Sequence, residues 1–142
     1  MWRSRRQNSD TVSLESMDLY REEILDHYKR PRNFGPLPAG GLKAMDRNAS
    51  CGDIIEIGIR FQNEKRKTKN EKIIQDIKFQ GEGCAIAIAS TSMLTEMVKG
   101  KTIAQAKKLT DKEMIKKLGI NISLGRKKCA TLGLVVLQKL LI

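Results

Sequence analysis

The sequence predicts an α+β fold, in which neighbouring antiparallel strands are grouped together and helices come before and after them. Two observations support this prediction: two runs that alternate apolar and polar residues, and several longer runs with helical spacing. With 142 residues, 40% of them hydrophobic, the chain fits one domain with one modest core. We expect residues 1–17 to be a disordered extension and residues 18–142 to form the domain.

The first predicted helix covers about residues 18–29, "DLYREEILDHYK", with acidic side chains early and basic ones late. It should end before Pro31, because proline does not continue a helix. The next stretch, "PRNFGPLPAGG", contains all three prolines of the chain. We expect an irregular loop there, followed by the sheet.

Two strands are predicted from "DIIEIGIRF" at residues 53–61 and "IIQDIKFQG" at residues 73–81. The polar connection "QNEKRKTKNEK" between them indicates an antiparallel pair. We interpret its basic residues as a solvated loop, with a docking or phosphate-binding patch as the alternative. The apolar side of the strands consists of Ile55, Ile57, Ile59, Phe61, Ile77 and Phe79.

Helical spacing returns in "GEGCAIAIASTSMLTEMVKGK", which predicts a buried helix with Cys84 in its first turn and an end near Gly100. Two short helices should follow, opened by threonine caps at Thr102 and Thr110. A last helix is predicted from "RKKCATLGLVVLQKLLI", with Cys129 near its start.

The formal net charge is +11, which favours acidic partners such as protein surfaces, nucleic acid or anionic lipid. The six aromatic residues are isolated, so a stacking platform for single-stranded nucleic acid is hard to build. We therefore expect no nucleic acid as a partner, and a basic nucleic-acid-binding module is kept as the alternative function. The tail "LGLVVLQKLLI" is too short to cross a membrane, and the arginine-rich start lacks a secretory signal's apolar run. The cytoplasm is the expected compartment, with organelle targeting as the weaker option.

Three widely spaced cysteines argue against a disulfide framework and for metal binding or thiol chemistry in a reducing compartment. Taken singly, each could be an ordinary buried thiol. We expect Cys84 and Cys129 at helix N-termini, where the helix dipole favours the thiolate. The cationic residues directly before Cys129 would add to this effect; they are Arg126, Lys127 and Lys128.

Cys51 lies just before the first predicted strand, and Asp53 follows it by two residues. Three sulfurs and one carboxylate would complete a tetrahedral zinc site, with bonds of about 2.3 Å to sulfur and about 2.0–2.2 Å to oxygen. Glycines at 52, 81 and 83 would let the backbone come close to such a site. No CxxC pair supports the metal site, so incidental thiols and a purely structural zinc site stay open as alternatives.

Four stretches resemble, in order, the iron–sulfur cluster assembly scaffolds of the IscU/SufU/NifU N-terminal type. They are "LYREEILDHYKRPRNFG", "NASCGD", "FQGEGCAIAIASTSML" and "KCATL", between about Leu19 and Leu132. The resemblance implies a SufE/NifU-like fold, with a small antiparallel sheet of about three strands packed against helices. It also implies one exposed site, made by Cys51, Asp53, Cys84 and Cys129.

The resemblance further implies a scaffold and sulfur acceptor rather than an enzyme of its own, with a sulfurtransferase-like role. Such proteins take persulfide sulfur from a cysteine desulfurase of the SufS or IscS kind and pass clusters to carriers or apo-proteins. Zinc, iron or a transient [2Fe–2S] cluster would bind at the four ligands. Cys51 and Cys129 are the candidate sulfur acceptors, with Arg126 in support.

Two departures bear on the subtype. Lys128 stands where the IscU type has a histidine, and the only histidine, His27, belongs to the first helix, where we expect a surface or capping group. The stretch "NISLGRK" replaces the proline-containing chaperone-recognition stretch, so a dedicated Hsp70-type chaperone is not expected as a partner. The "RKKCATL" motif is similar to the SufU type, but the SufU insertion between the second and third cysteines is missing. We interpret the chain as SufU-like without that insertion.

Overall fold

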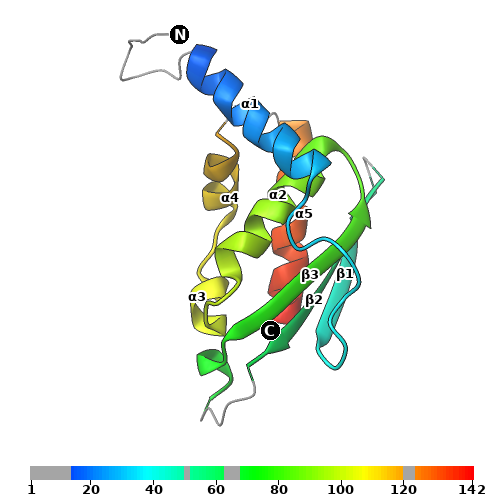
Figure 1. Cartoon of the computed structure of the whole chain (residues 1–142), viewed down its shortest axis with the longest axis vertical. Coiled ribbons are helices and arrows are strands. Elements are labelled where there is room, and N and C mark those ends of the chain that lie inside the picture. The colour runs from blue at the N-terminus through cyan, green and yellow to red at the C-terminus, as the bar shows by residue number, and fades with distance from the viewer. Residues whose placement is uncertain (1–13, 50–51, 63–67, 120–123) are drawn as a thin grey trace.

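The computed structural model describes residues 14–49, 52–62, 68–119 and 124–142 (Figure 1). These residues form an α+β fold, which confirms the predicted class. The elements, in chain order, are α1 (Leu14–Lys29), β1 (Leu42–Asn48), β2 (Asp53–Phe61), a 3-10 turn (Lys69–Glu71), β3 (Ile74–Glu82), α2 (Ala85–Val98), α3 (Ile103–Lys107), α4 (Asp111–Leu118) and α5 (Leu124–Leu140).

The sheet is antiparallel, with the strand order β1-β2-β3. Both predicted strands are present, and Ile55, Ile57 and Ile59 of the central strand are fully buried. The first strand was not located from the sequence, because most of its residues are polar or exposed. Its register places Asn48 opposite Asp53, so the last residue of β1 lies beside the first residue of β2.

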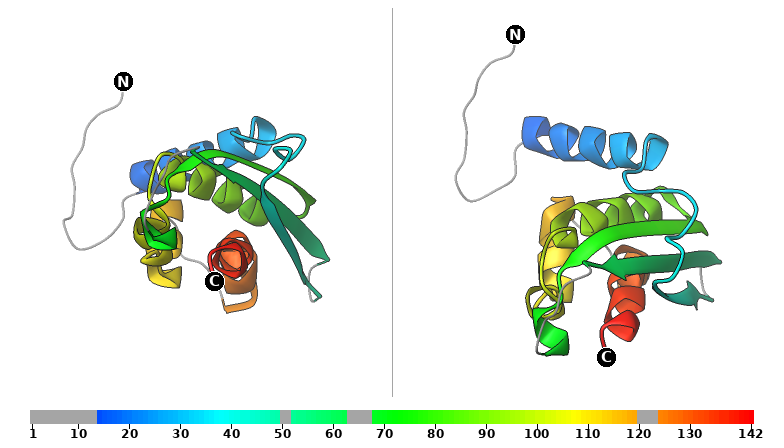
Figure 2. Two further views of the ribbon diagram at one scale, coloured as in Figure 1. Left: turned by 90° about the horizontal axis from the view of Figure 1, so that it is seen from below. Right: turned by 60° about the horizontal axis from the view of Figure 1, so that its bottom comes forward.

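Helices α2 and α5 cover one face of the sheet, and α1 packs on α2 on the side away from α5 (Figures 1 and 2). The loop after α1 crosses the opposite face, where Leu37 and Pro38 lie against Gly58 of β2. The same loop pairs with β3, since Gly35 N–H donates to the Phe79 carbonyl at 3.0 Å. The hydrophobic core therefore lies between the sheet and the α2–α5 pair.

Helix α5 approaches α2 very closely at Gly133. A Cβ atom placed on Gly133 would lie 2.5 Å from the Thr91 hydroxyl oxygen, which is closer than real Cβ atoms come. The Thr91 hydroxyl is itself satisfied, because it donates to the Ala87 carbonyl at 2.8 Å. Only glycine fits at this contact, which fixes how α5 lies on α2.

Several predicted boundaries can be compared directly with the structure. Helix α1 begins at Leu14, four residues before the predicted start, and ends at Lys29 as predicted. Residues 14–17, the end of the predicted disordered extension, are helical, and disorder stays a prediction for residues 1–13, which lie outside the described residues. The capping boxes at Thr102 and Thr110 are both present. Across the described ranges, no helix is both long enough and apolar enough to cross a membrane.

His27 is not a surface or capping group, and this expectation was wrong. Its side chain is 5% exposed and lies between α1 and α2, where Nδ1 is 2.7 Å from the Ser92 hydroxyl oxygen. That oxygen also accepts a hydrogen bond from Arg32 N–H at 2.8 Å, and His27 Nε2 lies 3.8 Å from Glu96. Burial, followed by the positive charge of Arg32, lowers the pKa of His27. The ring is therefore kept neutral and joins α1 to α2.

We expect the stability of the metal-free protein to fall as the pH drops below about 6.5, the ordinary pKa of histidine. Below that pH the unfolded chain binds a proton that folded His27 resists, because its pKa is lowered. The loss is at most about 1.4 kcal/mol per pH unit for one proton. Urea unfolding at about pH 7.5 and about pH 5.5 measures it.

The matched control is His27→Asn, which keeps a group able to hydrogen bond to Ser92 and removes the titration. The variant should lose less stability than the wild type between the two pH values. Equal losses in both proteins would show that other groups control the pH dependence.

Candidate metal centre

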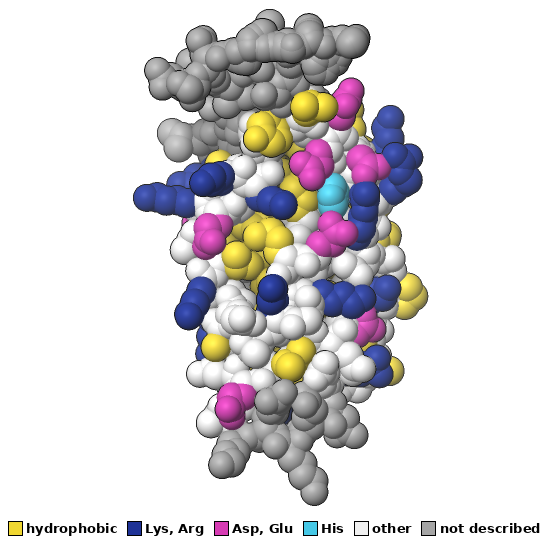
Figure 3. Space-filling model, turned by 60° about the vertical axis from the view of Figure 1, so that its left-hand side comes forward, with side chains coloured by type: hydrophobic (Ala, Val, Ile, Leu, Met, Phe, Trp, Pro, Cys, Tyr) yellow, Lys and Arg dark blue, Asp and Glu magenta, His cyan; other side chains and the backbone are white. Residues whose placement is uncertain are grey.

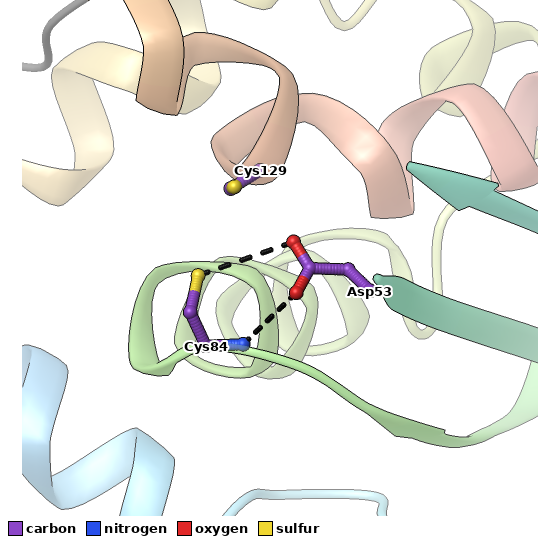
Figure 4. A group of neighbouring side chains, drawn as sticks. All are labelled: Asp53, Cys84 and Cys129. Atoms are coloured by element: carbon purple, nitrogen blue, oxygen red, sulfur yellow. Dashed lines mark hydrogen bonds between the residues drawn. The ribbon is translucent and has the colours of Figure 1, made fainter. Parts of the chain in front are cut away.

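Three of the predicted ligands converge from distant parts of the chain (Figure 4). Asp53 is the first residue of β2, Cys84 is the N-cap of α2, and Cys129 lies on α5. One ligand atom from each of them lies within 4.8 Å of the other two. Cys51, the fourth predicted ligand, lies outside the described residues, so its place in the site stays a prediction.

Asp53 is anchored at the N-terminus of α2. Its side chain is almost fully buried, and Oδ1 accepts a hydrogen bond from the Cys84 backbone N–H at 3.0 Å (Figure 4). A helix N-terminus is a favourable place for a carboxylate, because its N–H groups are unpaired and its dipole is positive there. The second oxygen, Oδ2, lies 4.0 Å from Cys84 Sγ. One oxygen thus holds the carboxylate in place, and the other faces the thiol.

Gly83 makes room for this carboxylate. A Cβ atom at position 83 would lie 2.7 Å from Asp53 Oδ1 and 3.0 Å from its carboxyl carbon. The sequence indicated that Gly83 would allow close approach, and the structure shows that the group that approaches is Asp53. Gly81 similarly admits the backbone, since a Cβ there would lie 2.1 Å from the Ile54 carbonyl oxygen.

The Cys129 thiol is buried, with 0% exposure, and it contacts a residue that the sequence reasoning missed. Asn48 Nδ2 lies 3.7 Å from Cys129 Sγ and donates a hydrogen bond to it. The register of β1 against β2 brings Asn48 there, beside Asp53. The only sequence signal was the position of Asn48 in the "NASCGD" stretch, three residues before Cys51.

The predicted position of Cys129 at a helix start was wrong, whereas that of Cys84 at the start of α2 is confirmed. Helix α5 begins at Leu124, so Cys129 is in its second turn, beyond the unpaired N–H groups of the first turn. The start of a helix therefore lies at Cys84 and not at Cys129. Arg126 and the two lysines after it lie on the first turns of α5 and are exposed.

The described donors fit a zinc or iron ion. Thiolate and carboxylate are both zinc ligands, and neighbouring ligand atoms of a tetrahedral site with bonds of about 2.3 Å lie about 3.8 Å apart. The observed limit of 4.8 Å is slightly wider, so a small inward movement of the side chains would bring them to bonding distance. Of the residues that would hold the metal, Asp53 would do so through Oδ2, because Oδ1 is already bonded to Cys84 N–H.

We expect Gly83→Ala to weaken zinc binding about tenfold or more, which is typical when a group that orients a ligand is changed. The new methyl group would push the Asp53 carboxylate away from the Cys84 N–H. Competition with a chromogenic chelator measures the affinity. The control is Gly100→Ala, where the left-handed backbone is strained but no atom lies within 4 Å of the new Cβ. Weakening of zinc binding by both variants alike would mean that general destabilisation is the cause.

Comparison with known proteins places this chain in a family. The family model described as the NifU-like N-terminal domain matches residues 19–141. The chain is 38% identical over 138 residues to the protein named zinc-dependent sulfurtransferase SufU of Bacillus subtilis, covering 85% of this chain and 88% of that one. It is 39% identical over 119 residues to the iron-sulfur cluster assembly scaffold protein IscU of Aquifex aeolicus, covering 84% of this chain and 71% of that one.

The fold is also found in a solved structure. The N-terminal part of a NifU-like protein from Brucella abortus superposes with a TM-score of 0.63, covering 87% of this chain and 92% of that one. Its sequence identity is 17%, so this likeness supports the fold alone. The family match and the two relatives confirm the resemblance found in the sequence. The chain belongs to the family of NifU-like N-terminal domains, among the SufU and IscU iron–sulfur cluster scaffolds.

Proposed function

We propose that the protein is an iron–sulfur cluster assembly scaffold and sulfur acceptor that works with a cysteine desulfurase. Zinc, iron or a [2Fe–2S] cluster would be held by Cys51, Asp53, Cys84 and Cys129, and cluster or sulfur would pass on to carriers or apo-proteins. The observation that carries the proposal is the convergence of Asp53, Cys84 and Cys129 at one end of α2. The names of the Bacillus and Aquifex relatives support the same two activities.

The thiolate and carboxylate donors suit a metal ion or cluster that is bound and later released. A bound zinc ion would hold the cysteines as thiolates, the form in which they are both ligands and nucleophiles. Two of the described donors belong to separate helices, and the third begins a strand. Asp53 already has a hydrogen-bond partner for one oxygen, so it stays satisfied when a ligand bond at the other oxygen is broken.

Sulfur acceptance is a thiol exchange. An acceptor thiolate attacks the outer sulfur of the persulfide on the desulfurase, a new S–S bond forms, and the desulfurase cysteine leaves as a thiolate. The attacking sulfur needs access to the partner, and Cys129 has none in this structure, while Cys84 is half-buried. Of the two acceptor candidates that the resemblance implies, we propose Cys51 as the first acceptor and Cys129 as a ligand that stays in place.

The first experiment is zinc binding to anaerobically purified protein, measured by chelator competition. Cys84→Ser should lower the affinity at least about tenfold, because a thiolate ligand is lost. Met97→Leu is the control, because it removes a half-buried sulfur near the other end of the same helix. Cys84→Ser binding as tightly as the wild type would refute the site.

Two further readouts of this experiment divide the alternatives. Tight zinc binding favours the zinc-dependent sulfur acceptor, and weak binding that still depends on Cys84 favours the cluster scaffold. The metal-free protein should stay folded, because the main core between the sheet and the helices does not involve the site. Cooperative unfolding on zinc removal would instead indicate a purely structural zinc protein.

The assignment of Cys51 predicts different effects for two cysteine variants. With a SufS-type desulfurase and cysteine in one turnover, Cys51→Ser should lose the first sulfur transfer, whereas Cys129→Ser should retain most of it. Alkylation followed by mass spectrometry counts the added sulfur atoms. Transfer that survives in Cys51→Ser and disappears in Cys129→Ser would reverse the assignment.

A further inference from the structure

A groove with a volume of about 350 Å³ runs between the end of β1 and the N-terminal half of α5. Arg47 and Asn48 line it from the strand, and Lys128, Leu132 and Val135 line it from the helix. It adjoins the metal centre, because Asn48 donates to Cys129 Sγ and Lys128 is the residue before Cys129. A molecule bound in this groove would therefore lie next to the ligands.

The acidic residue that lines the groove is paired, whereas its two basic residues are not paired with a described acid. The acid that lines it, Asp46, is 3.0 Å from the ammonium group of Lys139 and accepts a hydrogen bond from Arg47 N–H at 2.7 Å. These two bonds, that from Arg47 first, lower the pKa of the Asp46 carboxyl, which stays ionised and paired. Arg47 and Lys128 are exposed, and neither makes an ion pair with any residue the structure describes. The end of the groove near Cys129 is therefore positive.

The helix side of the groove is apolar. Val135 is a large hydrophobic residue that is 38% exposed, and Leu132 lies one turn before it. Covering an exposed valine removes apolar surface from water, which is favourable by roughly 25 cal/mol per Å². The groove thus offers an apolar seat flanked by two cations.

The edge strand beside the groove, β1, is not well suited to pair with an added strand. The Met45 carbonyl oxygen accepts from the Lys139 ammonium at 3.4 Å, and Arg47 N–H is taken by Asp46. Native edge strands are commonly protected by such charged side chains. Recognition in this groove therefore falls to side chains and not to the β1 backbone.

We propose that the groove is a docking site for an acidic segment of a partner protein, with an apolar side chain on Val135 and carboxylates against Arg47 and Lys128. The charge complementarity selects an acidic occupant, and the apolar seat selects a protein segment over a simple anion. Placing this partner in sulfur or cluster exchange rests on the proposed function; the docking itself does not.

The probe is a short fluorescein-labelled peptide that alternates leucine and glutamate, measured by fluorescence anisotropy at physiological salt. The test variant is Arg47→Glu with Lys128→Glu. The control, Lys69→Glu with Lys107→Glu, makes the same change in net charge on exposed residues of the 3-10 turn and α3. We expect the test variant to weaken peptide binding about tenfold or more, which corresponds to about 1.4 kcal/mol, and the control to change it less than about twofold.

Val135→Ser should also weaken peptide binding. A peptide with glutamine in place of glutamate should bind poorly to the wild type. Equal loss in the test and control variants would overturn the proposal, because net charge alone would then explain binding. No binding to the wild type would overturn it as well. If oligothymidylate binding depends on Arg47 and Lys128 as strongly as peptide binding does, the groove is a nucleic-acid site and the proposal is overturned.

The outcome is separable from that of the proposed function. Zinc binding by the Arg47→Glu and Lys128→Glu variant, measured alongside, should be retained, because neither residue is a predicted ligand. Peptide binding is measured on metal-free and zinc-loaded protein alike. Failure of the proposed function would appear as zinc binding that ignores Cys84, whereas failure of the docking site would appear only with the peptide.

Discussion

The contact between α5 and α2 at Gly133 and Thr91 determines where the two described candidate ligands with sulfur lie. Because Gly133 has no side chain, the two helices meet at a distance that any larger residue would prevent. Cys129 precedes Gly133 by about one turn, and Cys84 precedes Thr91 by about two turns. Both cysteines are therefore on the N-terminal side of the contact, and packing of the helices brings them to the same end of the molecule.

The sheet adds the candidate oxygen ligand, Asp53, to this pair. Asp53 begins the central strand, whose buried isoleucines pack beneath α2 and α5 and hold the strand against them. Its carboxylate is then positioned by Cys84 N–H and by the absence of a side chain at Gly83. A buried carboxylate needs a hydrogen-bond partner, and the Cys84 N–H supplies one to Asp53.

Much of this arrangement could be predicted from the sequence, because local patterns carry it. Alternation predicted β2 and β3, and helical spacing with threonine caps predicted the helices after Cys84. The first strand was not predicted, because its inward-facing residues are small or polar and most of them are only half-buried. The start of α5 was placed too late, and this error put Cys129 at the helix terminus.

Other features depend on contacts between distant segments, which no local pattern encodes. Asn48 and Cys129 are 81 residues apart along the chain. The pairing of β1 with β2 brings Asn48 to Cys129. His27 bonds to Ser92 across 65 residues, and its helix has too mixed a pattern to show which face is buried. The resemblance to a family supplied the ligand set, and the structure supplied the residues that orient it.

The net charge of +11 alone does not define a binding surface. The face in Figure 3 shows blue cationic side chains interspersed with magenta acidic ones and yellow apolar ones, with no continuous basic area. Asp26 binds both Arg30 and Arg32, so these cations are locally neutralised. At about 0.15 M salt, charges more than about 8 Å apart are largely screened from each other. Arg47 and Lys128 can therefore guide a partner to the centre more effectively than the many lysines farther away, because they adjoin it and are not neutralised by a described acid.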